Sequence, residues 1–536
     1  MDHAFARFQT VSRVTRQEMQ AALRYHEATK HSEAKLRSDA HFLDWSNQPR
    51  GFKIYRNIEP VPLPSDPKIL SGATTPALDA LGMPLVDVLD PGTGERVPAL
   101  ATLARVLYLA AGITKRRRSP GGEVTFRAYA NTGALYHIDL YLVTGDLPDL
   151  PAGVYHFGPH DFALRRLRPG DYRSVLAEST GDHVRVAGAP VTLVSASTYW
   201  RNAWKYQART YRHCFWDAGT MHANLLAVAD AESLRSMVVL GFADAKVAEL
   251  LGLDVQREAA LTLVPLGRSA SDPPPAPSMS ELGVETEPLS KSEVDYPLIR
   301  EMHAASSLAS GAAAAAWRVG IPEPDSEVAG STVSPLKLEA AAALPRVSLT
   351  DVIRKRGSTR AFDRTRAISM EALSAVLDRA TRGIAADVLI PPGATLLDFY
   401  LIVHAVEGLP PGTYYYRRDE RSLELLREGN FRAPAGRLGL GQQLPADAAV
   451  NIYSLCSLPA VLGRFGNRGY RVAQLEGGIT AGRMYLGAYA HGFGATGLTF
   501  FDDDVTDFFS PHAAGKSVMF LVALGYPDRA ALGLKR

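Results

Sequence analysis

Hydrophobic and polar positions divide the chain into short strands and a few long helices. Partial alternation over residues 135–143 and 396–403 predicts strands. The nearly continuous apolar runs 189–197 and 448–456 predict buried strands. Because antiparallel hairpins and long helices accompany these few strands, we expect an α+β fold and not a doubly wound parallel sheet.

Two long helices are predicted over residues 211–229 and 470–490. Each follows a predicted hairpin, which begins at Gly153 in the first case and at Gly412 in the second. Each helix leads through a loop to a last apolar strand. The two halves of the chain therefore have the same order of elements.

Each of these elements lies 259 residues from its counterpart, as Gly153 does from Gly412. A constant spacing across different motifs indicates an internal duplication. We expect a first copy at residues 1–267 and a second copy at 346–536. Residues 268–345 are rich in Pro, Ser and Ala, which predicts a linker that contains a helix.

Composition excludes several classes of protein. Of the 536 residues, 46% are hydrophobic and 21% are charged, which excludes wholesale disorder, collagen and coiled coil. Lys and Arg number 58 against 56 Asp and Glu, so the net charge of +2 gives no sign of binding to nucleic acid or to a membrane surface. With two cysteines, no membrane-span pattern and no secretory signal, the sequence predicts a cytoplasmic protein.

The most concentrated candidate for chemistry is a basic cluster in the second copy. Guanidinium groups and a hydroxyl at alternate positions can converge on one phosphate. The alternative is a solvated run of charges at a helix end. The corresponding stretch of the first copy, residues 85–96, lacks the cluster. The residues concerned are Arg354, Arg356, Ser358 and Arg360.

A polar loop in the first copy is the second candidate. Asn131, Thr132 and Gly133 enter a predicted strand, and their polar groups could contact the edge of a planar heterocycle or could form a plain turn. The second copy has residues 389–393 instead, without Asn or Thr. The two copies therefore lack complementary halves of a site.

Lys205 and Tyr206 form the third candidate, just before the first long helix. Such a pair can transfer protons, because partial burial is expected to bring both pKa values toward neutrality. A basic-aromatic packing corner is the alternative. The second copy has residues 463–465 here, Gly-Arg-Phe, which cannot play the same part.

A glycine-rich stretch near the end of the second copy contains Gly494, Ala495 and Gly497. It is interpreted either as a close approach of the backbone to a ligand or as a tight turn. It does not open a helix after a strand, so a dinucleotide-binding fingerprint is disfavoured.

Other motifs are absent from the sequence, including Walker A, His-Glu-x-x-His, Gly-x-Ser-x-Gly and Cys/His spacing for a metal. No metal site is therefore expected. The histidines that we interpret as structural are His26, His31, His137, His222 and His491.

Several segments, in order, resemble the SagB/ThcOx-type branch of the nitroreductase superfamily. The resemblance covers nearly the whole chain, and the second copy is the more diverged. The segments are YHEATKHS from Tyr25, FKIYRNIEPVPLP from Phe52, NTGALYHIDLYLV from Asn131, LPAGVYHFGP from Leu150, WKYQARTYRHCFWDAG from Trp204 and GFADAKVAELLGLD from Gly241.

The resemblance implies an α+β homodimer fold with FMN at the dimer interface. Here the fused copies would form an intramolecular pseudo-dimer with one composite FMN site. Lys205 and Tyr206 match the Lys-Tyr pair of members that oxidise azolines. The residues implied to hold FMN are Arg354, Arg356, Ser358, Arg360, Asn131, Thr132, Gly133, Gly494, Ala495 and Gly497.

Three functions remain open at this point. The first is an FMN-dependent dehydrogenase that converts azolines to azoles, or makes a similar desaturation, in ribosomally made peptides. The second is an NAD(P)H-dependent flavin reductase of nitro, quinone or dehydroamino-acid substrates, and the third is a flavin-free scaffold in a modification complex. The expected partners are a peptide or small-molecule substrate and other modification enzymes, and further association of chains is possible.

Overall fold

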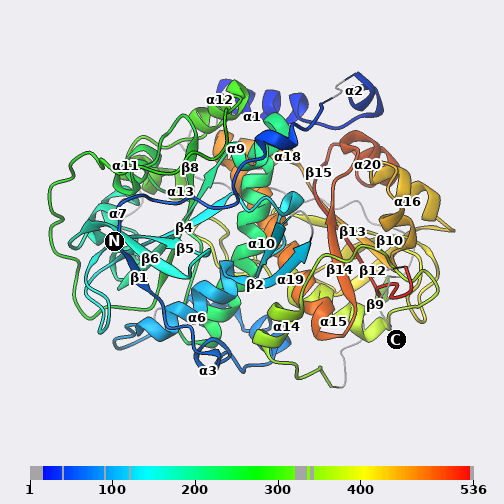
Figure 1. The fold of residues 1–536 in the computed structure, drawn as a ribbon. Helices are drawn as coiled ribbons and strands as arrows, with labels where there is room; N and C mark the ends of the chain where they lie inside the picture. The colour runs from blue at the N-terminus through cyan, green and yellow to red at the C-terminus, as the bar shows by residue number, and fades with distance from the viewer. Residues whose placement is uncertain are drawn as a thin grey trace, which may run out of the picture.

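The computed structural model describes residues 16–38, 41–89, 92–119, 122–319, 335–338 and 343–531. Within these ranges two antiparallel sheets lie on either side of two long central helices, α10 (Thr210–Ala231) and α19 (Gly469–Ala490) (Figure 1). One sheet belongs to the first copy and the other to the second. The expected α+β fold of two similar domains in tandem is confirmed.

The first sheet has the strand order β1-β6-β5-β4-β7-β8 and the second has the order β14-β15-β13-β10-β11-β12-β9. Strands β2 and β3 pair only with each other among the described residues. The bounds are β1 (Pro60–Pro62), β2 (Ile113–Ser119), β3 (Gly122–Arg127), β4 (Ile138–Thr144), β5 (Gly153–Gly158), β6 (Ala163–Pro169), β7 (Val191–Thr198), β8 (Glu258–Leu266), β9 (Leu336–Lys337), β10 (Asp398–Val403), β11 (Gly412–Arg417), β12 (Ser422–Glu428), β13 (Val450–Cys456), β14 (Gly494–Leu498) and β15 (Ser517–Gly525).

Helices cover the sheets and meet at the centre. None of those described combines the length and the apolar character needed to cross a bilayer. Besides α10 and α19, the longer helices are α1 (Arg16–Ala28), α6 (Leu100–Ala111), α7 (Arg173–Ser179), α9 (Trp200–Tyr206), α11 (Asp244–Leu251), α12 (Pro297–Ala305), α13 (Gly311–Val319), α14 (Leu349–Lys355), α15 (Met370–Ala380), α16 (Arg432–Leu438), α18 (Leu458–Phe465) and α20 (Asp502–Phe509). The short ones are α2 (Glu33–Ser38), α3 (Pro67–Leu70), α4 (Ala77–Ala80), α5 (Leu85–Leu89), α8 (Val184–Ala187) and α17 (Gln443–Asp447), with 3₁₀ turns η1 (Trp45–Asn47), η2 (Thr132–Ala134), η3 (Gln207–Arg209) and η4 (Gly466–Arg468).

The duplication extends to irregularities within the sheets. The register between β5 and β6 shifts at Val154/Tyr155, and the register between β11 and β12 shifts at Thr413/Tyr414. A second pair of shifts, in β7–β8 and in β13–β15, repeats in the same way. A β-bulge is a defined feature of the backbone that related domains share. The two copies therefore share a backbone design as well as an order of elements.

The two central helices approach each other at glycines. A Cβ atom added to Gly219 of α10 would lie 2.7 Å from the backbone of Gly478 in α19, and one added to Gly478 would lie 2.5 Å from Trp216 O. One turn further on, Ala223 of α10 faces Gly482 of α19. Only residues without a side chain allow this separation of the two backbones. The crossing therefore joins the copies through equivalent positions.

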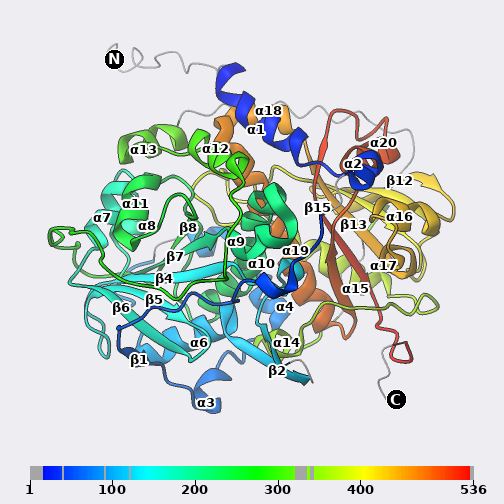
Figure 2. The same cartoon turned by 45° about the horizontal axis from the view of Figure 1, so that its top comes forward.

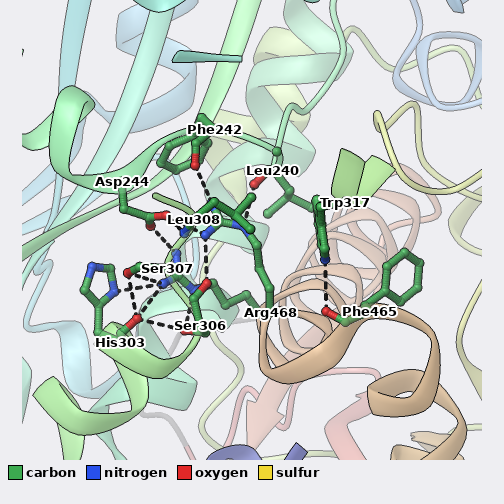
Figure 3. A network of polar contacts seen from close by, with 12 residues as sticks. Leu240, Phe242, Asp244, His303, Ser306, Ser307, Leu308, Trp317, Phe465 and Arg468 are labelled. Carbon is green, nitrogen blue, oxygen red and sulfur yellow. Dashed lines mark hydrogen bonds and ion pairs between the residues drawn. The ribbon is translucent and has the colours of Figure 1, made fainter. Parts of the chain in front are cut away.

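A buried carboxylate of the first copy binds two arginines of the second (Figure 3). Asp244, at the start of α11, lies 2.6 Å from Nη1 of Arg468 and 2.6 Å from Nη1 of Arg471. Burial raises the pKa of Asp244, but the two guanidinium groups outweigh that effect and lower it to about 2. Arg468 and Arg471 also donate to Ser306, in the segment that follows α12.

The mirror arrangement joins the copies a second time. Asp502, at the start of α20 in the second copy, pairs with Arg209 and Arg212 at the beginning of α10. Burial raises the pKa of Asp502, and the two arginines reverse the shift and hold it well below its usual range. Each copy thus supplies one carboxylate and one arginine pair.

Segments preceding each copy's sheet complete the two clusters. Arg212 donates to the carbonyl of His26 and to Thr29 at the end of α1. Arg471 likewise donates to the carbonyl of His303 and to Ser306 at the end of α12. Helix α12, which lies in the predicted linker, therefore has the same contacts as α1, and the repeat extends into that segment.

We expect Gly219→Ala to destabilise the protein by about 1–3 kcal/mol, because its methyl group would overlap the backbone of Gly478. Urea unfolding would measure the loss. Gly463→Ala is the matched control, since Gly463 is an exposed helical glycine with no atom within 4 Å of an added Cβ. Alanine should stabilise that helix by up to about 1 kcal/mol. Equal effects of the two changes would contradict the proposed role of the crossing.

We expect Asp244→Asn to cost about 3–5 kcal/mol at neutral pH, because it leaves two buried guanidinium groups without a carboxylate. The folded pKa of Asp244 is depressed, so its contribution is complete above the unfolded pKa of about 3.9 and is lost as pH falls toward about 2. Urea unfolding at pH 7 and pH 3 should therefore show a smaller difference from the wild type at pH 3. Glu249→Gln, exposed on the same helix, should change stability at neither pH.

Candidate active site between the two copies

Arg356 crosses from the second copy to the first. Its Nε donates to the carbonyl of Ala128 at 2.9 Å, and Nη2 donates to that of Arg127 at 3.1 Å. The residue is only 6% exposed, and burial lowers the pKa of its guanidinium. No carboxylate pairs with it among the described residues; the groups that oppose the shift are tyrosines such as Tyr485. A buried cation without a counterion favours an anionic ligand.

Tyr485, on α19, connects three parts of the candidate site. Its hydroxyl lies 3.1 Å from Oγ of Ser358 and accepts a hydrogen bond from the Gly497 amide at 2.6 Å. The Arg356 guanidinium lies 5.7 Å from the centre of its ring. The basic cluster and the glycine-rich stretch, separated by more than a hundred residues, are therefore neighbours.

The glycine-rich stretch forms strand β14 and runs beside the basic cluster. Ala495 forms a parallel bridge with Ser358, and the Thr359 amide donates to the Ala495 carbonyl at 3.0 Å. A Cβ on Gly494 would lie 2.1 Å from Oγ1 of Thr359, so a side chain here would displace the Thr359 hydroxyl. The backbone of this stretch therefore lies against the basic cluster, and its close approach to a ligand stays a prediction.

The polar loop of the first copy is held by Asp217 of α10. That carboxylate accepts hydrogen bonds from the amide and the hydroxyl of Thr132 and lies 2.9 Å from Nε2 of His137. Oδ1 of Asn131 accepts from the Tyr136 amide, whereas its Nδ2 is buried without a partner in the described structure. A buried amide that lacks an acceptor is a candidate ligand contact.

Gly133 brings the polar loop against Lys205 and Tyr206. It has a φ of 65°, and an added Cβ would lie 2.9 Å from the Tyr206 hydroxyl. Lys205 is half-buried at the end of α9, with Nζ 5.3 Å from the centre of the Tyr206 ring. The Tyr206 ring packs edge-on against His213, with centroids 4.7 Å apart.

The expectation that burial brings Tyr206 toward neutrality is wrong. Burial raises the pKa of its phenol, because the charged form is the one that burial disfavours, and the carboxylate of Asp217 raises it further. The guanidinium of Arg360, from the second copy, opposes this shift. Tyr206 therefore keeps its proton at neutral pH and can donate a hydrogen bond.

The structure brings most of the predicted residues together, but not all. Arg356, Ser358, Ala495 and Gly497 adjoin one another, and Gly133 adjoins Tyr206. Arg360 is exposed, and its guanidinium opposes the rise in the pKa of Tyr206. Arg354 is exposed on α14, and no hydrogen bond in the described structure joins it to the others.

The other side of the pseudo-dimer differs from the candidate site, because there the two copies are bridged directly. Val238 lies in the segment of the first copy that corresponds to β14, and it pairs with Ala386 of the second copy. The carboxylate of Asp387 accepts hydrogen bonds from the amides of Leu240 and Gly241. A cavity of about 20 Å³ remains beside Leu85, with room for little more than one water.

Sequence reasoning missed two residues that organise the site, Tyr485 and Asp217. Asp217 could have been identified from the repeat, because its counterpart 259 residues further on is also acidic. That counterpart, Glu476, accepts hydrogen bonds from Thr395 and from the Leu396 amide. Burial raises the pKa of Glu476 to about 7. Tyr485 could not have been identified in this way, because its counterpart in α10 is Leu226.

No group of three or more His, Cys, Asp or Glu side chains in the described ranges is arranged to hold a metal ion. Of the histidines interpreted as structural, His26, His137 and His222 have side-chain hydrogen-bond partners within the fold. His26, for example, lies 3.2 Å from the Tyr470 hydroxyl, and His222 lies 2.7 Å from Thr262 Oγ1.

Comparison with known proteins gives the same picture. A nitroreductase-family protein of Methanocaldococcus jannaschii is 27% identical over 169 residues, which cover 32% of this chain and 80% of that protein. The microcin B17-processing protein McbC of Escherichia coli is 31% identical over 148 residues, 27% of this chain and 54% of McbC. The match thus spans about half of McbC.

A solved structure shares the fold across almost the whole length. A nitroreductase-family protein from Anabaena variabilis superposes with a TM-score of 0.72 at 24% sequence identity, covering 95% of this chain and 99% of that one. The likeness to McbC agrees with the expected SagB/ThcOx-type branch. The model of the Nitroreductase family matches residues 95–268 and again residues 353–526, more than half of the chain. The chain therefore belongs to the Nitroreductase family, an oxidoreductase family, with two family domains in tandem.

Proposed function

We propose that the protein is an FMN-dependent oxidoreductase that desaturates a peptide, such as an azoline ring to an azole, with one composite site between the copies. The observation that carries the proposal is the buried Arg356 guanidinium, which has no carboxylate partner in the described structure and lies where elements of both copies meet. None of the described side chains of the site can accept a hydride, so the proposed reaction requires a bound cofactor.

The residues of the site fit such a cofactor. Arg356 and Arg360 would hold its phosphate, because guanidinium groups bind phosphate through charge-assisted hydrogen bonds. Nδ2 of Asn131 is a buried polar atom without a partner among the described residues. It could hydrogen-bond to the ribityl chain or to the ring. The direct bridge between Val238 and Ala386 on the other side of the pseudo-dimer supports one FMN per chain.

The chemistry that bound FMN supplies is a two-electron oxidation, in which a hydride leaves the substrate. Nζ of Lys205 would accept the proton that the substrate also loses. Burial raises the pKa of Tyr206 and keeps its phenol protonated, so its hydroxyl can orient the substrate by donating a hydrogen bond. Asp217 holds the loop that packs on Tyr206 and so fixes this geometry.

The choice of a peptide substrate rests on relatives. McbC, which this chain resembles, is a protein that processes microcin B17. The relative from M. jannaschii supports a second candidate, an NAD(P)H-dependent reductase. Anaerobic mixing with NADPH separates the two, since only a reductase would bleach the flavin without a peptide.

We expect the purified protein to carry about one FMN per chain and Arg356→Ala with Arg360→Ala to lose it, because the phosphate would lose its cations. The absorption spectrum and the released flavin would be measured. Arg360→Ala alone keeps the test valid if loss of Arg356 disturbs folding. Exposed Arg346 and Arg364, both changed to Ala, form the control and should retain FMN. An unchanged FMN content in the double variant would favour the flavin-free scaffold.

We expect Lys205→Ala to lower turnover by about 100–10,000-fold with FMN still bound, as is typical for loss of a general base. Tyr206→Phe should have a smaller effect on turnover, because the hydroxyl that it removes only donates a hydrogen bond to the substrate. Steady-state oxidation of an azoline peptide would be measured beside the flavin content. Normal turnover in Lys205→Ala would rule out this residue as the base.

A further inference from the structure

The β2–β3 hairpin is an addition to the first copy. It follows α6, whereas the chain after the corresponding α15 runs on without a hairpin in the described part of the second copy. Figure 2 shows β2 at the lower edge of the molecule, near α14. Because the two outer edges of this small sheet pair with no other strand in the described ranges, its backbone can accept a further strand.

The hairpin has a concentrated positive charge. Residues 115–118 read Lys-Arg-Arg-Arg, and all four are exposed. The side chain of Arg116 is 52% exposed and that of Arg118 is 93% exposed. Their one acidic partner among the described residues is Glu123 on β3, which pairs with both. One carboxylate cannot balance four cations.

The hairpin adds its charge to that of the candidate site. Nζ of Lys115 donates to the carbonyls of Lys355 and Arg356, at 2.9 and 2.7 Å. Partial burial, together with the nearby Arg356, lowers the pKa of Lys115, as expected for neighbouring cations. We call the exposed cations of this surface the basic rim. Its members are Lys115, Arg116, Arg117, Arg118, Arg354 and Lys355.

Few acidic groups oppose the basic rim. Asp351 lies on α14, the helix that carries Arg354 and Lys355. Its carboxylate accepts a hydrogen bond from the hydroxyl of Ser348, the residue that caps the beginning of this helix. Arg117, Arg354 and Lys355 have no ion-pair partner within 4 Å in the described structure. The whole chain has a net charge of only +2, so the excess of positive charge is local. A local field of one sign attracts a ligand of the opposite sign.

We propose that the basic rim docks an acidic segment of the peptide substrate, extended along an edge of the β2–β3 hairpin. The inference rests on the proposed function, because it takes the substrate to be a peptide. Main-chain hydrogen bonds to the edge would align the segment, and the cations would select for Asp and Glu. Since Lys115 contacts the backbone of Arg356, a segment held there begins beside the candidate site.

A peptide fits this surface better than a single-stranded nucleic acid. Proteins that bind single strands usually offer aromatic side chains on which bases stack. Phe126 is the aromatic residue of the hairpin, and it is partly buried. The exposed apolar residue is Val124, at 47% exposure, which suits a peptide side chain. Basic residues on a free strand edge can also serve only to prevent aggregation, which the following experiment tests.

The experiment measures binding of a fluorescein-labelled decaglutamate peptide to the full-length protein by fluorescence anisotropy. We expect binding at low salt that weakens about tenfold or more at high salt. Arg117→Glu with Arg118→Glu should weaken binding about tenfold or more, and Arg117→Gln with Arg118→Gln should have an intermediate effect. Arg24→Glu with Arg37→Glu is the matched control, because both side chains are exposed and lie on α1 and α2, away from the hairpin.

The outcomes separate this inference from the proposed function. Equal loss in the two charge-reversed variants, or no binding by the wild type, would overturn the docking surface while FMN content and turnover test the oxidoreductase. Binding of labelled decathymidylate as tight as that of decaglutamate would overturn the assignment to a peptide. Thermal unfolding of each variant checks folding. Selective loss in the hairpin variants, with the Gln variant between, would support the proposal.

Discussion

The crossing of α10 and α19 at Gly219 and Gly478 is the constraint on which the rest of the structure depends. Because the backbones touch at equivalent positions, the two copies meet face to face and the site elements of each lie beside those of the other. A side chain at either glycine would push the helices apart. Arg356 donates to two carbonyls of the first copy across the same interface.

The two arginine-aspartate clusters give the crossing its orientation. Separating a buried carboxylate from its two guanidinium groups would leave buried charges without a partner. Each cluster therefore favours the arrangement of the two copies in which these three groups meet. Each cluster takes its carboxylate from one copy and its arginines from the other. Segments at the ends of α1 and α12 accept further hydrogen bonds from Arg212 and Arg471, which joins the predicted linker to the interface.

Repeats in the sequence predicted the architecture, since spacing reports elements that fold alike. The long helices, the hairpins and the duplicated sheet follow from it, and the basic cluster did prove to adjoin the glycine-rich stretch. The role of Tyr485 could not be predicted, because it depends on which side chain of a wholly buried helix faces the loop. Nor could the state of Tyr206, whose pKa depends on burial and on Asp217. The contacts of α12 could not be predicted either, because this helix lies in a segment whose composition is typical of a linker.

The asymmetry of the two copies has a physical origin in this arrangement. A symmetric dimer must keep every site residue in both subunits, because one gene encodes both. In a fused chain each copy can change alone. The first copy keeps the polar loop with Lys205 and Tyr206, and the second keeps the basic cluster and β14. On the opposite side, Val238 pairs directly with Ala386 across the interface. Val388 and Leu389, which follow Ala386 closely in the chain, are buried, so this side of the interface adds to the shared core.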